Sequence, residues 1–172
     1  MIINPQEILD KEFVVAAQNC PAINVGEQLQ QAGIDVRLNK VFTVNTPIIR
    51  FGKKVKPDFS EIYSEVQPDS AGWIRLQPGK AYSVDTMEDC VVPIDAAAFV
   101  LHRSTFNRSG VFITGSVYDP GFEGNIGATM YVHNTVEVEV GTRIAQILFV
   151  KASAASTYKG TYNLLKSHAS GK

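Results

Sequence analysis

Eight short apolar runs, each bounded by turn residues, constrain the fold of this chain more than any other feature of its sequence. Runs of this length are typical of strands, because a helix needs about ten or more residues to bury one face. The runs cover residues 34–44, 73–76, 81–84, 98–102, 111–114, 126–132, 136–140 and 144–150. So many short strands in 172 residues predict an all-β sandwich, barrel or jelly roll.

Two segments outside these runs have a different character. Residues 5–17 are predicted to form a helix, since Asn4 can cap it, Pro5 suits its first position, and apolar residues recur at helical spacing. Residues 45–72 are polar and lack periodicity. They predict a long excursion between strands, with room for a short strand or helix of its own.

The composition favours a single domain over residues 1–172, in which residues 152–172 form a mobile tail. With 45 % hydrophobic and 19 % charged residues, the chain can build one ordinary core. Its 16 basic and 17 acidic side chains nearly balance, so we expect a small ligand and no nucleic-acid partner. No run of about 18 apolar residues occurs. We therefore expect a cytoplasmic protein with no membrane association, in which Cys20 and Cys90 are reduced thiols.

The strongest chemical signal lies in residues 102–110, which contain Arg103, Arg108 and three hydroxyl side chains. The planar guanidinium group and the serine hydroxyl both match phosphate oxygens, so the segment predicts a phosphate-binding loop. A solvated turn with a helix cap at Ser104 is an equal alternative from the residues alone.

A second signal lies in residues 114–125, where Asp119 stands between an apolar run and the turn residues Pro120 and Gly121. A carboxylate fixed there can polarise a water molecule for attack on phosphorus. It can also accept the backbone N–H groups of its own turn, which is the interpretation that the residues alone favour.

Other polar residues fall within the predicted strands. Asp35 could support the water shell of a metal ion or pair with Arg37, and the ion pair is the simpler interpretation. Glu137 and Glu139 alternate with valines, as on the wet face of a half-exposed strand. Gln146 lies in an apolar strand, where its amide would need a partner.

Two nucleotide-binding signatures are missing from the sequence. The three histidines are scattered and no Cys pair has metal-ligand spacing, which excludes a zinc nucleobase deaminase. A glycine-rich phosphate loop ending in Gly-Lys-Ser/Thr is also missing, which excludes the P-loop hydrolases.

Four segments, taken in order, resemble the first four motifs of the superfamily of trimeric dUTPases and dCTP deaminases. They are Ala32-Gly33-Ile34-Asp35, Arg103-Ser104-Thr105-Phe106 with Gly110, Asp119-Pro120-Gly121-Phe122-Glu123-Gly124, and Gly141-Thr142-Arg143-Ile144-Ala145-Gln146. The resemblance spans residues 32–150, and residues 76–104 are more similar to the deaminase branch. The tail segment Tyr158-Lys159-Gly160-Thr161-Tyr162 also resembles that branch.

The resemblance implies a distorted β-barrel or jelly roll of the dUTPase β-clip type, with a short N-terminal helix and a C-terminal lid. It also implies a homotrimer with three active sites at subunit interfaces. The implied cofactor is Mg²⁺, held by the bound triphosphate and not by direct protein ligands, with Asp35 acting through a water molecule.

The resemblance also implies roles for individual residues. Asp119 matches the aspartate that orients the attacking water, and Arg108 is the second implied catalytic residue. Phe122 matches the aromatic residue under the sugar. The implied substrate-binding residues are Arg103, Ser104, Thr114, Gly115, Phe122, Gln146, Tyr158, Lys159 and Tyr162.

One position separates the two activities of the superfamily. Deaminases carry a glutamate ten residues beyond the equivalent of Asp119, and this chain has Thr129 there. A threonine hydroxyl cannot exchange protons with a cytosine ring near neutral pH, whereas a carboxylate with a raised pKa can. The hairpin is also about two residues shorter than the family pattern implies, which leaves its register open.

The sequence therefore predicts a dUTP diphosphatase that forms dUMP and pyrophosphate on a deaminase-like scaffold. A dCTP deaminase, with or without subsequent hydrolysis, is the first alternative, because Arg108 and Thr114 match positions that deaminases use around the base. A catalytically silent nucleotide-binding regulator is the second. The expected ligand is dUTP, with dCTP and dTTP as further candidates.

Overall fold

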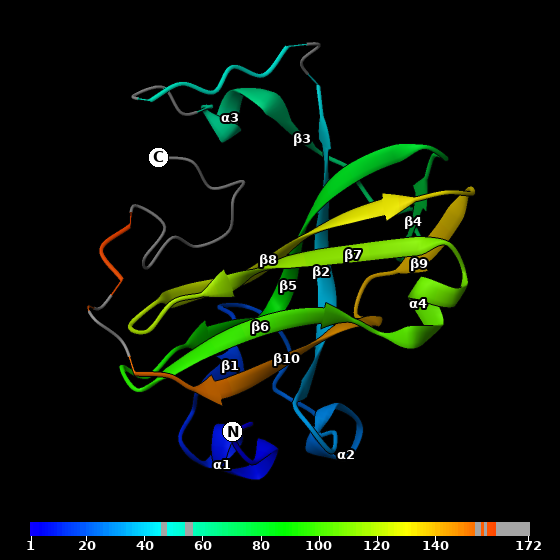
Figure 1. Ribbon diagram of the computed structural model, residues 1–172. Coiled ribbons are helices and arrows are strands. Elements are labelled where there is room, and N and C mark those ends of the chain that lie inside the picture. Colours follow the sequence, from blue (N-terminus) through cyan, green and yellow to red (C-terminus); the bar gives the residue numbers. More distant parts are fainter. Residues whose placement is uncertain (46–47, 54–56, 154–155, 157, 161–172) are drawn as a thin grey trace.

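A closed barrel of six antiparallel strands forms the centre of the computed structural model (Figure 1). The structure describes residues 1–45, 48–53, 57–153, 156 and 158–160. The barrel strands, in spatial order, are β5 (Lys80–Val91), β8 (Glu123–Val132), β7 (Val111–Tyr118), β6 (Ala96–His102), β10 (Arg143–Lys151) and β2 (Ile34–Val44). Pairing of β2 with β5 closes the ring, so the predicted all-β barrel class is confirmed.

Smaller elements surround the barrel. The three-residue strands β1 (Val14–Ala16) and β3 (Tyr63–Glu65) pair with β5 and β2, while β4 (Trp73–Leu76) and β9 (Val136–Glu139) form a separate two-stranded sheet. The described residues contain four short helices, which are α1 (Pro5–Asp10), α2 (Val25–Gln28), α3 (Phe59–Ile62) and α4 (Ser104–Arg108). In the part of the chain that the structure describes, no helix is long and apolar enough to cross a membrane.

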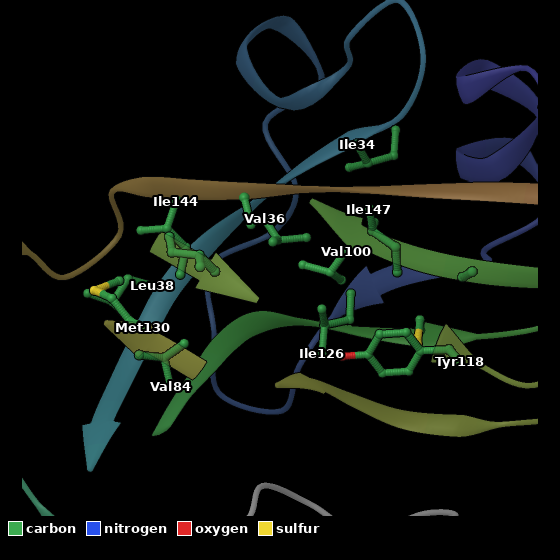
Figure 2. Packing of buried hydrophobic residues seen from close by; sticks show 14 of the residues in the cluster. Ile34, Val36, Leu38, Val84, Val100, Tyr118, Ile126, Met130, Ile144 and Ile147 are labelled. Atoms are coloured by element: carbon green, nitrogen blue, oxygen red, sulfur yellow. The ribbon is translucent and has the colours of Figure 1, made fainter. Parts of the chain in front are cut away.

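Apolar side chains from all six barrel strands fill the interior (Figure 2). On β2, Ile34, Val36 and Leu38 are fully buried at every second position, because successive side chains of a strand point to opposite faces. Burying a side chain of this size stabilises the fold by roughly 1.5–3 kcal/mol. The interior residues labelled in Figure 2 are Ile34, Val36, Leu38, Val84, Val100, Tyr118, Ile126, Met130, Ile144 and Ile147.

The predicted helix over residues 5–17 is wrong in its second half. Asn4 caps α1 as expected, accepting a bond from the backbone N–H of Gln6, but the helix ends at Asp10. Glu12 then adopts a left-handed φ of 55°, and the chain continues as β1. The β-branched Val14 and Val15 pair with β5. This strand pairing outweighs the helical spacing of the apolar residues.

Strand β5 extends well beyond the predicted run 81–84. The prediction was too short because several residues in the second half of the strand are polar although they are buried. Asp85, Thr86 and Glu88 are all at most 1 % exposed. Glu88 accepts bonds from the backbone N–H and the guanidinium Nε of Arg37, both at 2.7 Å, and from the Gln28 amide at 2.9 Å. Such partners make burial of a carboxylate tolerable, but they leave no apolar pattern in the sequence.

The excursion at residues 45–72 is partly ordered against the barrel. It contains α3 and β3, and β3 pairs with residues 42–44 of β2. Asp58 caps α3 by accepting a 2.9 Å bond from the backbone N–H of Ser60. The expectation of a short element within this segment is therefore confirmed.

Candidate functional site: two half-sites at opposite ends of strand β6

A cluster of charged side chains forms around Asp35, and we call Asp35, Arg103, Arg143 and Gln146 the cationic cluster. Oδ2 of Asp35 lies 3.2 Å from Nε of Arg103 and 3.4 Å from a guanidinium nitrogen of Arg143. Its Oδ1 accepts a 3.3 Å bond from the Gln146 amide. Residues of the first, second and fourth motifs therefore meet at one place.

Strand pairing explains why these distant residues meet. Asp35 on β2 lies directly opposite Gln146 on β10. Ala145, next to Gln146, lies opposite His102, so that Arg103 leaves β6 beside the same pair. The sequence-based pairing of Asp35 with Arg37 is wrong. Strand β2 lies between β10 and β5, and Arg37 instead pairs with Glu88 of β5.

The electrostatics of the cationic cluster favour an anionic ligand. Asp35 is 1 % exposed, and this burial raises the pKa of its carboxyl, while Arg103, Gln146 and Arg143 act in the opposite direction. The two arginine side chains are each 31 % exposed. Two cations around one buried carboxylate leave an excess of positive charge that solvent, or a phosphate, can reach.

Helix α4 follows directly after Arg103, which occupies the N-cap position with no side-chain cap bond. The alternative of a helix cap at Ser104 is therefore wrong, since Ser104 is the first helical residue and is exposed. Arg108 ends the helix and is also exposed, and Gly110 closes the turn with a φ of 76°.

A pocket of about 300 Å³ lies at the other end of β6 and β7, and we call it the carboxylate pocket. Asp119 is exposed on its wall. The turn that follows is closed by the backbone carbonyl of Asp119, which accepts a 3.0 Å bond from Phe122. The carboxylate is thus not the group that closes the turn. The lining residues are Phe59, Ser116, Val117, Tyr118, Asp119, Phe122, Asn125, Gly127 and Tyr158.

Aromatic rings line much of the carboxylate pocket. The Phe122 ring lies 5.2 Å from that of Tyr118 and 5.4 Å from that of Tyr158, the latter edge to face. The backbone N–H of Tyr158 donates a 2.7 Å bond to the carbonyl of Pro120. The described part of the tail therefore returns to the Asp119 turn, and Lys159 is exposed beside it. Tyr162 lies outside the described residues.

The two half-sites do not meet within one chain. Tyr118 lies opposite Ala98 on β6, so Asp119 lies near the start of that strand, whereas Arg103 follows its end. The intervening extended chain from residue 98 to residue 103 spans about 17 Å. Figure 1 shows the same separation, with α4 at one end of β6 and the β7–β8 turn at the other.

The register of the β7–β8 hairpin places Thr129 beside Thr114. The two residues are directly paired, and both are exposed. Gly115, the next residue on β7, crosses β6 so closely that an added Cβ would lie 2.5 Å from Cβ of Val100. A glycine is required for this approach. The position that resembles the deaminase glutamate thus holds a hydroxyl.

Several residues of these half-sites were not assigned a role from the sequence. Arg143 lies within the fourth motif, three residues before Gln146, and a cation within that motif was the signal that could have identified it. Asn125 ends the segment 114–125 that carries Asp119, whereas Phe59 lines the carboxylate pocket without a local motif, because tertiary packing brings it there.

Comparison with known proteins shows which family this sequence and fold resemble. Residues 6–152 match a family model described as dCTP deaminase-like, and the chain belongs to this family. Its relatives are named as nucleotide-processing enzymes.

A probable deoxyuridine 5'-triphosphate nucleotidohydrolase of Methanopyrus kandleri is 31 % identical over 140 residues, covering 79 % of this chain and 88 % of the relative. A dUMP-forming dCTP deaminase of Persephonella marina is 33 % identical over 140 residues, covering 78 % of this chain and 77 % of the relative. The structure of a 2'-deoxycytidine 5'-triphosphate deaminase from Agrobacterium tumefaciens superposes with a TM-score of 0.68 at 19 % identity. That alignment covers 86 % of this chain and 47 % of the other, and it confirms the fold.

Proposed function

We propose that the protein is a dUTP diphosphatase, which hydrolyses dUTP to dUMP and pyrophosphate. One observation carries this proposal: the carboxylate of Asp119 is exposed in an aromatic-lined pocket and is not used to close its own turn. A carboxylate in that position can orient a water molecule and accept its proton during attack on the α-phosphate. The curated relative from Methanopyrus kandleri carries the corresponding name.

The cationic cluster supplies the second requirement of the reaction, which is charge compensation on the triphosphate. Arg103, Ser104 and Gln146 bind phosphate oxygens, and the Gln146 amide also donates a bond to Asp35. Hydrogen-bond donors that are already oriented toward developing negative charge stabilise the transition state. Arg108, on the exposed end of α4, contributes a further cation near the same phosphates.

Because the two half-sites lie at opposite ends of β6, we propose that one subunit supplies Asp119 and a neighbour supplies the cationic cluster. A homotrimer with cyclic symmetry forms three such sites, since each interface joins two different surface patches. The described part of the tail then forms a lid over the nucleotide, with Tyr158 facing the base and Lys159 near the phosphates. A lid of this kind excludes water other than the reacting molecule.

Magnesium fits this site only as an ion that the nucleotide itself binds. Both oxygens of Asp35 are already engaged by Gln146 and the arginines, and no three His, Cys, Asp or Glu side chains gather within the described ranges. We therefore assign no direct protein ligand to the ion, and Asp35 would contact it through a water molecule. When bound to the triphosphate, Mg²⁺ neutralises charge on the phosphate oxygens.

Deamination of dCTP is the competing activity, and one relative is named a dUMP-forming dCTP deaminase. Thr129 disfavours it, because the residue opposite Thr114 has no carboxylate to move protons to and from a cytosine ring. We therefore propose that this chain performs only the hydrolytic step.

Product analysis tests the proposed function directly. Purified protein is incubated with Mg²⁺ and either dUTP or dCTP, and the nucleotides are separated while ammonia and pyrophosphate are measured. We expect dUMP and pyrophosphate from dUTP, and no ammonia from dCTP. Formation of dUTP or dUMP from dCTP would contradict the assignment of Thr129, and inert dUTP would contradict the proposed activity.

Subunit complementation tests the shared site. Asp119→Asn and Arg103→Ala are each expected to be inactive alone, whereas in randomly mixed trimers about a quarter of the interfaces join two intact half-sites. Partial recovery of dUTP hydrolysis after co-expression is the expected result. No recovery, with mixed trimers verified by mass, would contradict a site built from two subunits.

A further inference from the structure

We propose that Phe59, carried by the excursion between β2 and β4, is a nucleoside-binding residue that forms the outer wall of the carboxylate pocket. This inference rests on the proposed function and deepens it. Phe59 lines the same pocket as Asp119, Phe122 and Tyr158, although it lies 60 residues before Asp119 in the chain. It thus adds a ring from a segment that carries none of the four motifs.

A stack of aromatic rings fixes the position of Phe59. Its ring lies 5.3 Å from that of Tyr63, and the Tyr63 ring lies 6.1 Å from that of Phe42, with both pairs stacked. Phe42 belongs to β2 and is only 1 % exposed. Stacked aromatic pairs add stability beyond the area that they bury, so Phe59 is tied to the barrel through two rings.

Backbone bonds hold the same segment against the barrel. The N–H of Asn45 donates to the carbonyl of Ile62, and the N–H of Val66 donates to that of Val41, both at 2.8 Å. The Asp58 carboxylate accepts bonds from both the N–H and the hydroxyl of Ser60, at 2.9 and 2.6 Å. Phe59 is therefore presented by an ordered turn of helix and not by a free loop.

The chemistry of the pocket walls indicates what this ring contacts. Phe122 and Tyr158 supply aromatic surface on one side, and Asp119 and Ser116 supply polar groups. A ligand that has a planar heterocycle joined to a hydroxylated sugar matches both kinds of wall. Stacking of a base on an aromatic ring contributes to affinity for any base with a π-face, so Phe59 should act mainly on nucleoside binding.

Substitution of Phe59 tests this role through the division between KM and kcat. Phe59→Ala should raise KM for dUTP roughly tenfold and leave kcat within about twofold, because loss of one stacked ring weakens binding without touching the reacting atoms. Phe59→Leu keeps an apolar side chain without the π-face and should show most of the same loss, while Phe59→Tyr should restore affinity. The matched control is Phe51→Ala, which removes a ring from the same segment at a position that is 80 % exposed.

A fluorescence experiment reports binding independently of turnover. Trp73 is the only tryptophan of the sequence, so a Trp73→Phe, Phe59→Trp double variant carries one reporter in the pocket. Saturable quenching by dUMP is expected, with none for inorganic phosphate alone. Unchanged KM in Phe59→Ala and Phe59→Leu, or a reporter silent to dUMP in a protein that hydrolyses dUTP, overturns the inference. Failure of the wild-type chain to hydrolyse dUTP instead overturns the proposed function, and the dUMP titration then still decides whether Phe59 walls a nucleoside pocket.

Discussion

The two ends of strand β6 differ in how their charged groups are used. At the cationic cluster, the charged groups hold one another, since Asp35 is buried between Arg103 and Arg143. At the carboxylate pocket, the Asp119 side chain is exposed among aromatic rings. The turn that follows is closed by a bond between backbone groups and not by this carboxylate. The difference teaches that a chain can hold a preorganised cluster of charged groups and an exposed carboxylate at positions too far apart to meet within one subunit.

The largest expected effect is at the carboxylate pocket. Asp119→Asn should lower kcat for dUTP by about 10²- to 10⁴-fold, because the amide no longer accepts a proton from water. Affinity for a non-hydrolysable dUTP analogue should remain, since the amide can still hydrogen-bond a sugar hydroxyl. Steady-state kinetics and calorimetry check the two parts, with Asp95→Asn as an exposed control at the same end of β6. A near-normal kcat would make Asp119 only a turn residue.

The next largest effect concerns the stability of the fold behind the cationic cluster. Glu88→Ala should lower the free energy of unfolding by about 3–5 kcal/mol, because it leaves the Arg37 charge without its buried partner. The Gln28 amide, which also donates to the backbone carbonyl of Asp35, would lose one of its two acceptors.

Urea denaturation measures this loss. The control is Glu65→Ala, which breaks the half-exposed pair with Lys40 and should cost no more than about 1 kcal/mol. Equal losses in the two variants would show that the network behind the cationic cluster has no special role.

A smaller effect is expected for ligand binding at the cationic end. Ser104→Ala and Gln146→Ala should each weaken binding of a non-hydrolysable dUTP analogue by about 1–3 kcal/mol, as for hydrogen bonds to charged groups. Isothermal titration calorimetry provides the measurement. Ser109→Ala is the control for the first variant, because the Ser109 hydroxyl is used within α4, bonding to the carbonyl of Thr105. Unchanged affinity in both variants would remove phosphate binding from this cluster.

The smallest effect is a dependence of stability on pH at Asp35. Burial raises the pKa of this carboxyl above its ordinary value, so the folded protein binds the proton more tightly than the unfolded chain does. Its contribution to stability is then fully present below the unfolded pKa and is lost as the pH rises through the folded pKa. The free energy of unfolding of wild type, relative to Asp35→Asn, should therefore increase as the pH falls from 7 toward 4. The opposite trend would mean that the two arginines outweigh burial.

The strands were predictable wherever their apolar alternation is regular. Residues 34–44 and 73–76 were predicted with the bounds that the structure has, because every second side chain is buried in β4, and the apolar residues at 34, 36 and 38 are buried in β2. Residues 85–91 of β5 were missed, since Asp85 and Glu88 are polar residues that are nevertheless buried, which a hydrophobic pattern cannot show.

The candidate site was predictable to the extent that its residues lie in motifs. Asp119, Arg103 and Gln146 were identified from the sequence, and the structure brings Gln146 and Arg103 around Asp35. Phe59 could not be identified, because its position depends on stacking against Tyr63 and Phe42 and not on its neighbours in sequence. The distance between Asp119 and Arg103 could not be predicted either, because it depends on how β6 pairs with β7.

Closure of the barrel between β2 and β5 also bears on self-association. An open sheet ends in strands whose unpaired N–H and C=O groups can template pairing with another molecule, and long edges of this kind promote aggregation. Here the ring is closed, and the strands added outside it, β1 and β3, have only three residues each. Among the described residues, the barrel therefore offers another copy of the chain little unpaired backbone, and we expect any contact between copies at the ring to be made mainly by side chains.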